Sequence, residues 1–190
     1  MHNIFLRRPA FTLWIVVLIT LCISVTLSIA VYYINYWPTD SENPYLPAAA
    51  KLFNLQHISD IHRLPLVGIL KVNMHGKEAL IVGIAVMQKI LNDTSSLYPN
   101  VLLLIMAVAV SSIAVFVIAR RLLGNAIGFI TFLFFVTCFW PYQYVIFGAH
   151  QPLALMNFLL AVICLPFFLK SPFAAIASGG FLGLMLFSSP

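Results

Sequence analysis

The sequence predicts an all-α, polytopic transmembrane helical bundle of about five spans, with interfacial helices in a large first extracytoplasmic loop. Only 8% of the 190 residues are charged and the mean hydropathy is +1.03, whereas globular proteins have about 25% charged residues. Asp, Glu, Lys and Arg are missing from residues 9–39, 94–119, 122–169 and 171–190. Each stretch is long enough to cross a bilayer, and none has the alternation of a barrel strand, so the spans are expected to be helices.

Five spans are expected within these stretches. They cover residues 10–34, 97–119, 126–147, 152–169 and 173–190. The chain then divides into a cytoplasmic N-terminus with the first helix (1–34), an extracytoplasmic loop (35–96) and the remaining spans (97–190). No flanking loop follows the fifth span, so we expect the chain to be cut off inside a larger fold.

Basic residues predict the orientation, because short cytoplasmic loops carry an excess of Lys and Arg. Arg7 and Arg8 precede the first span, Arg120 and Arg121 close the second, and Lys170 closes the fourth. These sites fall on one side, which indicates a multi-pass protein with a cytoplasmic N-terminus. We expect its membrane to be a bacterial inner membrane. The net charge of +5 reflects this orientation, and nucleic acid is excluded as a partner.

The first span could also be a cleaved signal peptide, with a small-residue site at Ser28-Ile-Ala30. Its apolar stretch, however, exceeds the 7 to 15 residues typical of such a peptide, and an aromatic belt of Tyr32, Tyr33, Tyr36 and Trp37 follows it. These features favour a retained anchor.

The loop 35–96 holds every acid of the chain, and its formal charge is zero. We expect a short helix over 48–55, an apolar stretch at 66–70, and a helix over 78–91 that lies along the outer interface, because its apolar run is too short to span. Membrane lipid is therefore an expected partner of this loop.

The loop also carries candidate chemistry. Asp40 and Glu42 lie just outside the membrane, and His62 and Arg63 precede a proline. A carboxylate can take a proton from an acceptor nucleophile, and a guanidinium can hold two phosphate oxygens. The alternative is that the acids are solvated and that Arg63 only contacts lipid headgroups.

Four motifs follow one another along the chain. The first two are Asp40-Ser-Glu42-Asn-Pro-Tyr45, with an alanine-rich run at 48–50, and Arg63-Leu-Pro65-Leu66. The last two are Ile118-Ala-Arg-Arg-Leu-Leu-Gly124, which ends the span after the interfacial helix expected over 78–91, and Phe139-Trp-Pro141 with Pro152-Leu153. In this order they resemble the N-terminal part of the GT-C membrane glycosyltransferases, which include the protein O-mannosyltransferases and the bacterial lipid A aminoarabinose transferases. The family's motifs are an Asp-Glu pair, His/Lys-Pro-Pro-Leu, Ala-Arg-Arg-Leu-Phe-Gly, and a Ser-Pro turn followed by Asp-x-Pro-Leu.

This resemblance implies transfer of a sugar from a polyprenyl-phosphate donor to an extracytoplasmic protein, lipid or glycan. Asp40 or Glu42 would be the general base and Arg63 the phosphate ligand, with His62, Tyr45 and His150 as further substrate-binding residues. No cofactor is required, although a divalent metal is compatible with the family.

The sequence departs from the family at three points. Ser41 separates the two acids, Arg63 and Leu64 replace the basic residue and first proline, and His150 stands where many members have a carboxylate. Arg keeps the charge but changes its shape, and a histidine changes pH dependence. His150 could instead be an interfacial histidine bonded to backbone. We therefore expect the chain alone to lack transferase activity.

A non-catalytic GT-C-like subunit is the alternative function. Its aromatic-rich third span would pack against membrane protein subunits of a larger complex. A transporter is disfavoured because no charged residue lies in the middle of a span. The three cysteines all fall within spans and predict neither a disulfide framework nor a metal site.

Overall fold

A computed structural model describes residues 9–34, 49, 78–93, 97–138, 142, 145, 151–167 and 171–186. All regular structure in these residues is helical, which confirms the predicted all-α class. The elements are α2 (Pro9–Ile34), α5 (Glu78–Leu91), α6 (Tyr98–Leu123), α7 (Asn125–Thr137), α9 (Gln151–Cys164), the 3₁₀ helix η3 (Leu165–Phe167) and α10 (Pro172–Leu186).

Two helices have the length and composition to cross a membrane, namely α2 over Ala10–Ala30 and α6 over Tyr98–Leu123. Each complete helix has 26 residues, or roughly 39 Å at 1.5 Å per residue, against a hydrocarbon core of about 30 Å. The other described helices are apolar but have only 10 to 17 residues in their apolar segments. A total of five spans stays a prediction.

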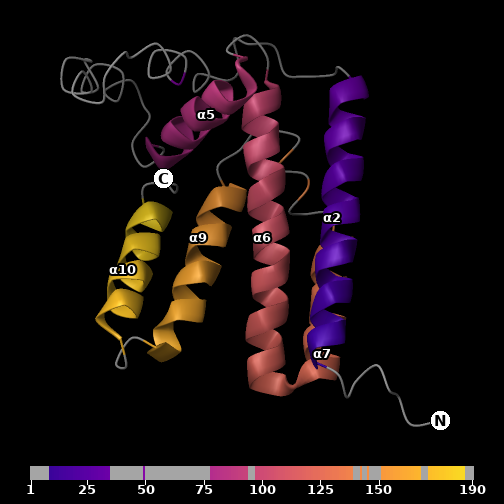
Figure 1. Cartoon of the computed structure of the whole chain (residues 1–190), viewed down its shortest axis with the longest axis vertical. Helices are drawn as coiled ribbons and strands as arrows, with labels where there is room; N and C mark the ends of the chain where they lie inside the picture. Colours follow the sequence, from indigo (N-terminus) through magenta and orange to yellow (C-terminus); the bar gives the residue numbers. More distant parts are fainter. Residues whose placement is uncertain are drawn as a thin grey trace.

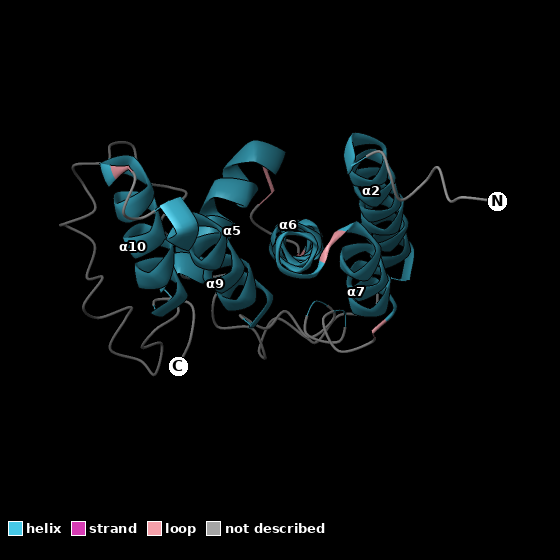
Figure 2. Cartoon of the chain, turned by 90° about the horizontal axis from the view of Figure 1, so that it is seen from below, coloured by secondary structure: helices cyan, strands magenta, loops and turns pink. Residues whose placement is uncertain are grey.

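Helix α6 is the central element of the described fold (Figures 1 and 2). It contacts α2 and α7 on one side and α9 on the other, and α5 packs obliquely against it. Helix α10 packs on α9. The N-terminal end of α2 and the C-terminal end of α6 lie at the lower end of Figure 1, whereas Ile34 and Tyr98 lie at the upper end.

Two buried clusters hold these helices together. The upper cluster joins α5, α6 and α9, together with Ala49 and Val145 from segments far apart in the chain. The lower cluster joins α2, α6 and α7 through Val16, Phe116 and Phe132. The bundle is thus packed around both halves of α6.

The third expected span, 126–147, is not one continuous helix. Helix α7 ends at Thr137, and Cys138 has extended backbone with φ −70° and ψ 129°. Pro141 accounts for this, because a proline ring clashes with the carbonyl four residues earlier, here that of Thr137. The prediction of one continuous helix over 126–147 was therefore wrong, although Tyr142 and Val145 are again helical.

The other boundaries agree more closely. Helix α6 continues past Arg120 and Arg121 and ends at Leu123, and the next residue, Gly124, has a φ of +92° that favours glycine. The structure has a helix over Glu78–Leu91, and its place in a loop at an interface stays a prediction. The helix expected over 48–55 lies outside the described residues except for Ala49.

Candidate functional site

The residues predicted for catalysis and binding lie outside the described part of the chain. They are Asp40, Glu42, Tyr45, His62, Arg63 and His150. Their grouping around a lipid-linked phosphate stays a prediction. The described residues that flank the loop 35–96 are Ile34 and Leu97, and the adjoining ends of α2 and α6 lie at the same end of the bundle (Figure 1).

A wide groove lies between the upper halves of α2 and α6. Its volume is about 550 Å³, within the range of small-molecule sites. Helix α2 lines it with Leu21, Ser24, Val25, Ser28 and Ile29, and α6 with Tyr98, Leu102, Ile105, Met106 and Ala109. The groove therefore reaches the first residue of α6, next to the ends of the predicted catalytic loop.

The groove walls are chemically apolar even where they carry hydroxyl groups. Ser28 Oγ donates a hydrogen bond to the carbonyl oxygen of Ser24 at 2.8 Å, inside the same helix. Such bonding to the preceding turn satisfies a hydroxyl without any ligand. A hydrocarbon chain is thus the occupant that matches these walls, and Tyr98 supplies a phenol at one end.

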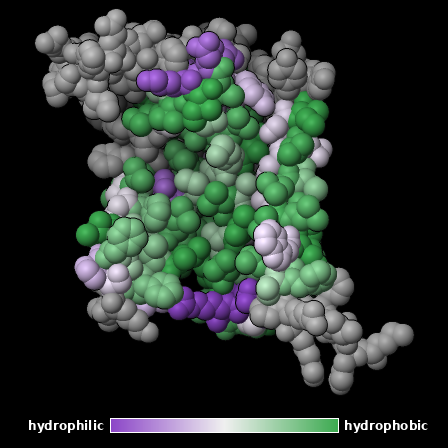
Figure 3. Space-filling view, viewed as in Figure 1, coloured by the Kyte–Doolittle hydropathy of each residue, from purple (hydrophilic) through white to green (hydrophobic). Residues whose placement is uncertain are grey.

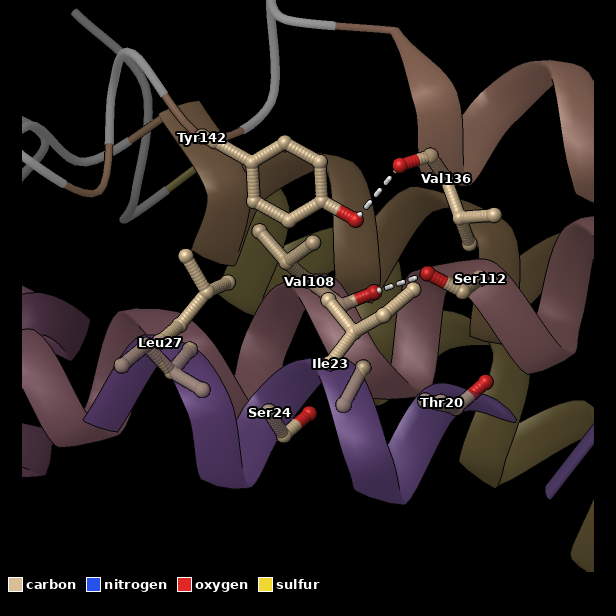
Figure 4. A pocket seen from close by; sticks show the side chains of 10 residues that line it. Thr20, Ile23, Ser24, Leu27, Val108, Ser112, Val136 and Tyr142 are labelled. Carbon is tan, nitrogen blue, oxygen red and sulfur yellow. Dashed lines mark hydrogen bonds between the residues drawn. The ribbon is translucent and has the colours of Figure 1, made fainter. Parts of the chain in front are cut away.

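A small cavity adjoins the groove, between α2, α6, the end of α7 and Tyr142 (Figure 4). Its volume is about 10 Å³, enough for one water molecule. Tyr142 Oη donates to the carbonyl oxygen of Val136 at 3.0 Å, and Ser112 Oγ to that of Val108 at 2.7 Å. Thr20 Oγ1 is buried and has no hydrogen-bond partner among the described residues, so it is the group that a water here would satisfy.

Three residues separate the cavity from the groove, because Ser24, Ile105 and Ala109 line both. Two of them are small, and small residues let helix backbones approach closely in membranes. Ser24 and Ser28 lie four residues apart, which is the spacing of the small residues that bring membrane helices together. That spacing is the sequence signal for the α2–α6 contact, which sequence reasoning missed.

No metal centre is found in the described residues, which contain no group of three His, Cys, Asp or Glu side chains able to hold an ion. The cysteines Cys22, Cys138 and Cys164 are free thiols. Whether the predicted loop residues bind a metal lies outside the described part of the chain.

Comparison with known proteins gives no relative: no family model, no curated protein and no solved structure matches the chain.

Proposed function

We propose that the chain is a multi-pass membrane protein of the GT-C glycosyltransferase type, and that the α2–α6 groove holds the hydrocarbon tail of a polyprenyl-phosphate sugar donor. The sugar would pass to an extracytoplasmic acceptor at the Tyr98 end of the groove. The observation that carries this proposal is the place of an apolar groove of about 550 Å³ beside the ends of the acid-bearing loop. Such a donor needs both an apolar channel and polar groups at its mouth.

The exposed face of α2 supports placement in a bilayer. It carries large apolar side chains along its length, 47–72% exposed: Phe11, Trp14, Leu18, Leu21, Val25 and Ile29. Soluble proteins rarely expose a continuous apolar face of this kind, which matches hydrocarbon instead. Figure 3 shows mainly hydrophobic surface between two ends that carry hydrophilic groups.

The arrangement of the helix ends supports the proposed orientation. The lower end of the bundle combines the start of α2, which Arg7 and Arg8 precede in the sequence, with Arg120 and Arg121 in the last turn of α6. Under the positive-inside rule this end faces the cytoplasm of a bacterial inner membrane. The groove mouth at Tyr98 then faces outward.

In the proposed reaction, an acceptor hydroxyl attacks the anomeric carbon of the donor sugar, and the bond from that carbon to the phosphate oxygen breaks. Asp40 or Glu42 takes the hydroxyl proton, and Arg63 stabilises the charge on the departing polyprenyl phosphate. The groove keeps the tail in place, so the reacting groups meet at a fixed depth.

A second candidate, a subunit of a larger membrane complex, is favoured by helix α10. A methyl group added at Gly179, Gly180 or Gly183 would meet nothing within 4 Å in the described fold. Glycine faces of this kind accept a neighbouring helix at close range in membranes. Co-purification of a partner that is lost when Gly180 is changed to Leu would support this role.

A photoreactive donor tests the main proposal. The probe is a polyprenyl phosphate with a diazirine in its tail, applied to membranes that contain the full chain. We expect labelling of α2 and α6 peptides, reduced several-fold by Val25→Trp, which narrows the groove. Leu18→Trp is the matched control, because Leu18 is an exposed residue of α2 that does not line the groove.

The phosphate contact is tested with the same probe and its phosphate-free alcohol. Arg63→Gln should weaken labelling by the phosphate and leave labelling by the alcohol unchanged, since only the phosphate needs a cation. Labelling of the Arg63→Lys protein by the phosphate probe should fall between that of the unmodified protein and that of Arg63→Gln. In the first of these two experiments, equal labelling of the Val25→Trp and Leu18→Trp proteins would contradict the proposal that the groove is the donor site.

A further inference from the structure

A second apolar cavity lies at the opposite end of the bundle from the groove mouth. It has a volume of about 90 Å³ between α6 and the α9–η3 segment. Its walls include Val117 and Leu122 of α6, with Val162 and Pro166 across from them, and Arg121 is the one charged residue that lines it. The cavity therefore combines a hydrocarbon slot with a guanidinium.

Aromatic rings hold the two guanidinium groups at this end. The guanidinium carbon of Arg121 lies 5.0 Å from the centre of the Phe167 ring, and that of Arg120 lies 5.8 Å from the centre of the Phe116 ring. Both distances fall within the range of cation–π interactions. An aromatic face orients a guanidinium without neutralising its charge, so Arg121 can still bind an anion.

Neither of the two acids among the described residues lies at this end of the bundle. All five acids lie between Asp40 and Asp93, and residues 94–190 contain Arg120, Arg121 and Lys170 but no Asp or Glu. Of the acids among the described residues, Glu78 begins α5 and Asp93 follows it, and α5 lies at the upper end of Figure 1, whereas α6 ends at the lower end. Figure 3 shows hydrophilic surface where α6 ends, directly below hydrophobic surface.

We infer that this cavity binds an anionic phospholipid of the surrounding membrane, with its phosphate on Arg121 and the start of an acyl chain between α6 and α9. Arg121 lies two residues before the end of α6, which places its charge at headgroup level when α6 spans the bilayer. Basic pockets between membrane helices on the cytoplasmic side bind anionic headgroups in this way. The inference rests on the proposed membrane placement, but it concerns a ligand and a site separate from the donor groove.

A tryptophan at position 167 reports on the site, because it keeps the aromatic contact with Arg121. The reporter protein carries Phe167→Trp, and its native Trp14, Trp37 and Trp140 are replaced by Phe. The full chain is placed in phosphatidylcholine nanodiscs, and quenching by brominated phosphatidylglycerol is compared with quenching by brominated phosphatidylcholine. We expect a preference for phosphatidylglycerol that inorganic phosphate does not abolish.

Variants assign the preference to the site. Arg121→Gln should lower the preference about fivefold, the equivalent of about 1 kcal/mol for one cation near an anionic lipid. Val162→Phe, which fills the slot, should lower quenching by both lipids. Lys89→Gln removes an exposed cation from α5, at the far end of the bundle, and should leave the preference for phosphatidylglycerol unchanged.

Two outcomes would overturn the inference. Equal quenching by the two lipids in the reporter protein would exclude an anionic-lipid site while leaving the membrane placement intact. An equal loss of the phosphatidylglycerol preference in Arg121→Gln and Lys89→Gln would show that the preference comes from general surface charge and not from this cavity. Absence of quenching by either lipid would instead contradict the membrane placement on which the proposed function also depends.

Discussion

Asn125 Nδ2 donates a hydrogen bond to Thr12 Oγ1 at 2.9 Å, which joins the first residue of α7 to the first turn of α2. Thr12 is buried. The contact fixes the N-terminal end of α2 beside the turn that follows Arg120 and Arg121. Both basic segments of the sequence therefore adjoin one end of the bundle, which is the basis of the proposed orientation.

A double-mutant cycle of Thr12→Val and Asn125→Ala should reveal this contact. We expect a coupling energy of about 0.6 to 1.7 kcal/mol, the range for hydrogen bonds between membrane helices. The measurement is reversible unfolding of the full chain in detergent. Thr131→Val replaces Thr12→Val in the control cycle, because Thr131 Oγ1 donates within its own helix to the carbonyl oxygen of Ile127. Zero coupling between Thr12 and Asn125 would show that the contact contributes nothing.

Gly128 permits the close α6–α7 hairpin. A Cβ built there lies 2.8 Å from the backbone nitrogen and Cα of Arg120, atoms that cannot move without shifting α6. Gly128→Ala should lower the free energy of unfolding by about 1 to 3 kcal/mol, the cost of overpacking. Gly179→Ala is the matched control, because a Cβ there meets nothing within 4 Å. Its free energy of unfolding should rise by up to about 1 kcal/mol, because alanine has a higher helix propensity than glycine. Thermal unfolding of both variants decides this, and equal stabilities would contradict the packing.

Gln88 is fully buried in the α5 helix, and neither amide heavy atom has a hydrogen-bond partner in the part of the chain that the structure describes. An unsatisfied buried polar group costs about 1 to 3 kcal/mol. Gln88→Met keeps the side-chain shape and removes both polar atoms, so it should raise the free energy of unfolding by a similar amount. Lys89→Met, at an exposed neighbouring position, should leave the stability unchanged. A destabilised Gln88→Met protein would mean that the amide has a binding partner in the folded protein.

The proposed base is tested by removing both acids together. In membranes of cells that make the protein together with the partners or further chain that transfer is expected to require, Asp40→Asn combined with Glu42→Gln should lower sugar transfer by about 10²- to 10⁴-fold, the usual contribution of a general base. Labelling by the photoreactive donor should persist, because the groove is unchanged. The Ser41→Ala protein is the neighbouring control. Transfer that survives the double substitution would exclude these acids as the base.

The positions of α2 and α6 could be predicted because length and missing charge alone define such helices. The spans 10–34 and 97–119 correspond to Pro9–Ile34 and Tyr98–Leu123. The extension of α6 was missed because an arginine pair marks a membrane boundary but does not end a helix, whereas the following glycine does. The early end of α7 could have been predicted from Pro141, whose effect reaches back four residues.

The groove could not be predicted from the sequence. Helices that are apolar on all sides carry no periodic signal for the face that meets a neighbour. The groove is lined by small residues such as Ser24 and Ala109 as well as by larger apolar side chains of both helices, a combination that only the packed structure shows. The catalytic residues proposed from motif order, from Asp40 to His150, lie outside the described residues and stay predictions.

Residues 35–96 and the Arg120–Arg121 turn are proposed to lie on opposite sides of a membrane. Single cysteines at Ser41 and Ala126, in a chain whose Cys22, Cys138 and Cys164 are replaced by Ala, test this proposal with a membrane-impermeant maleimide on intact cells. Ala126 is an exposed residue at the start of α7. We expect Ser41→Cys to be labelled at once and Ala126→Cys to be labelled only after the membrane is permeabilised. Labelling of Ala126→Cys in intact cells would contradict it, whether or not Ser41→Cys also reacts.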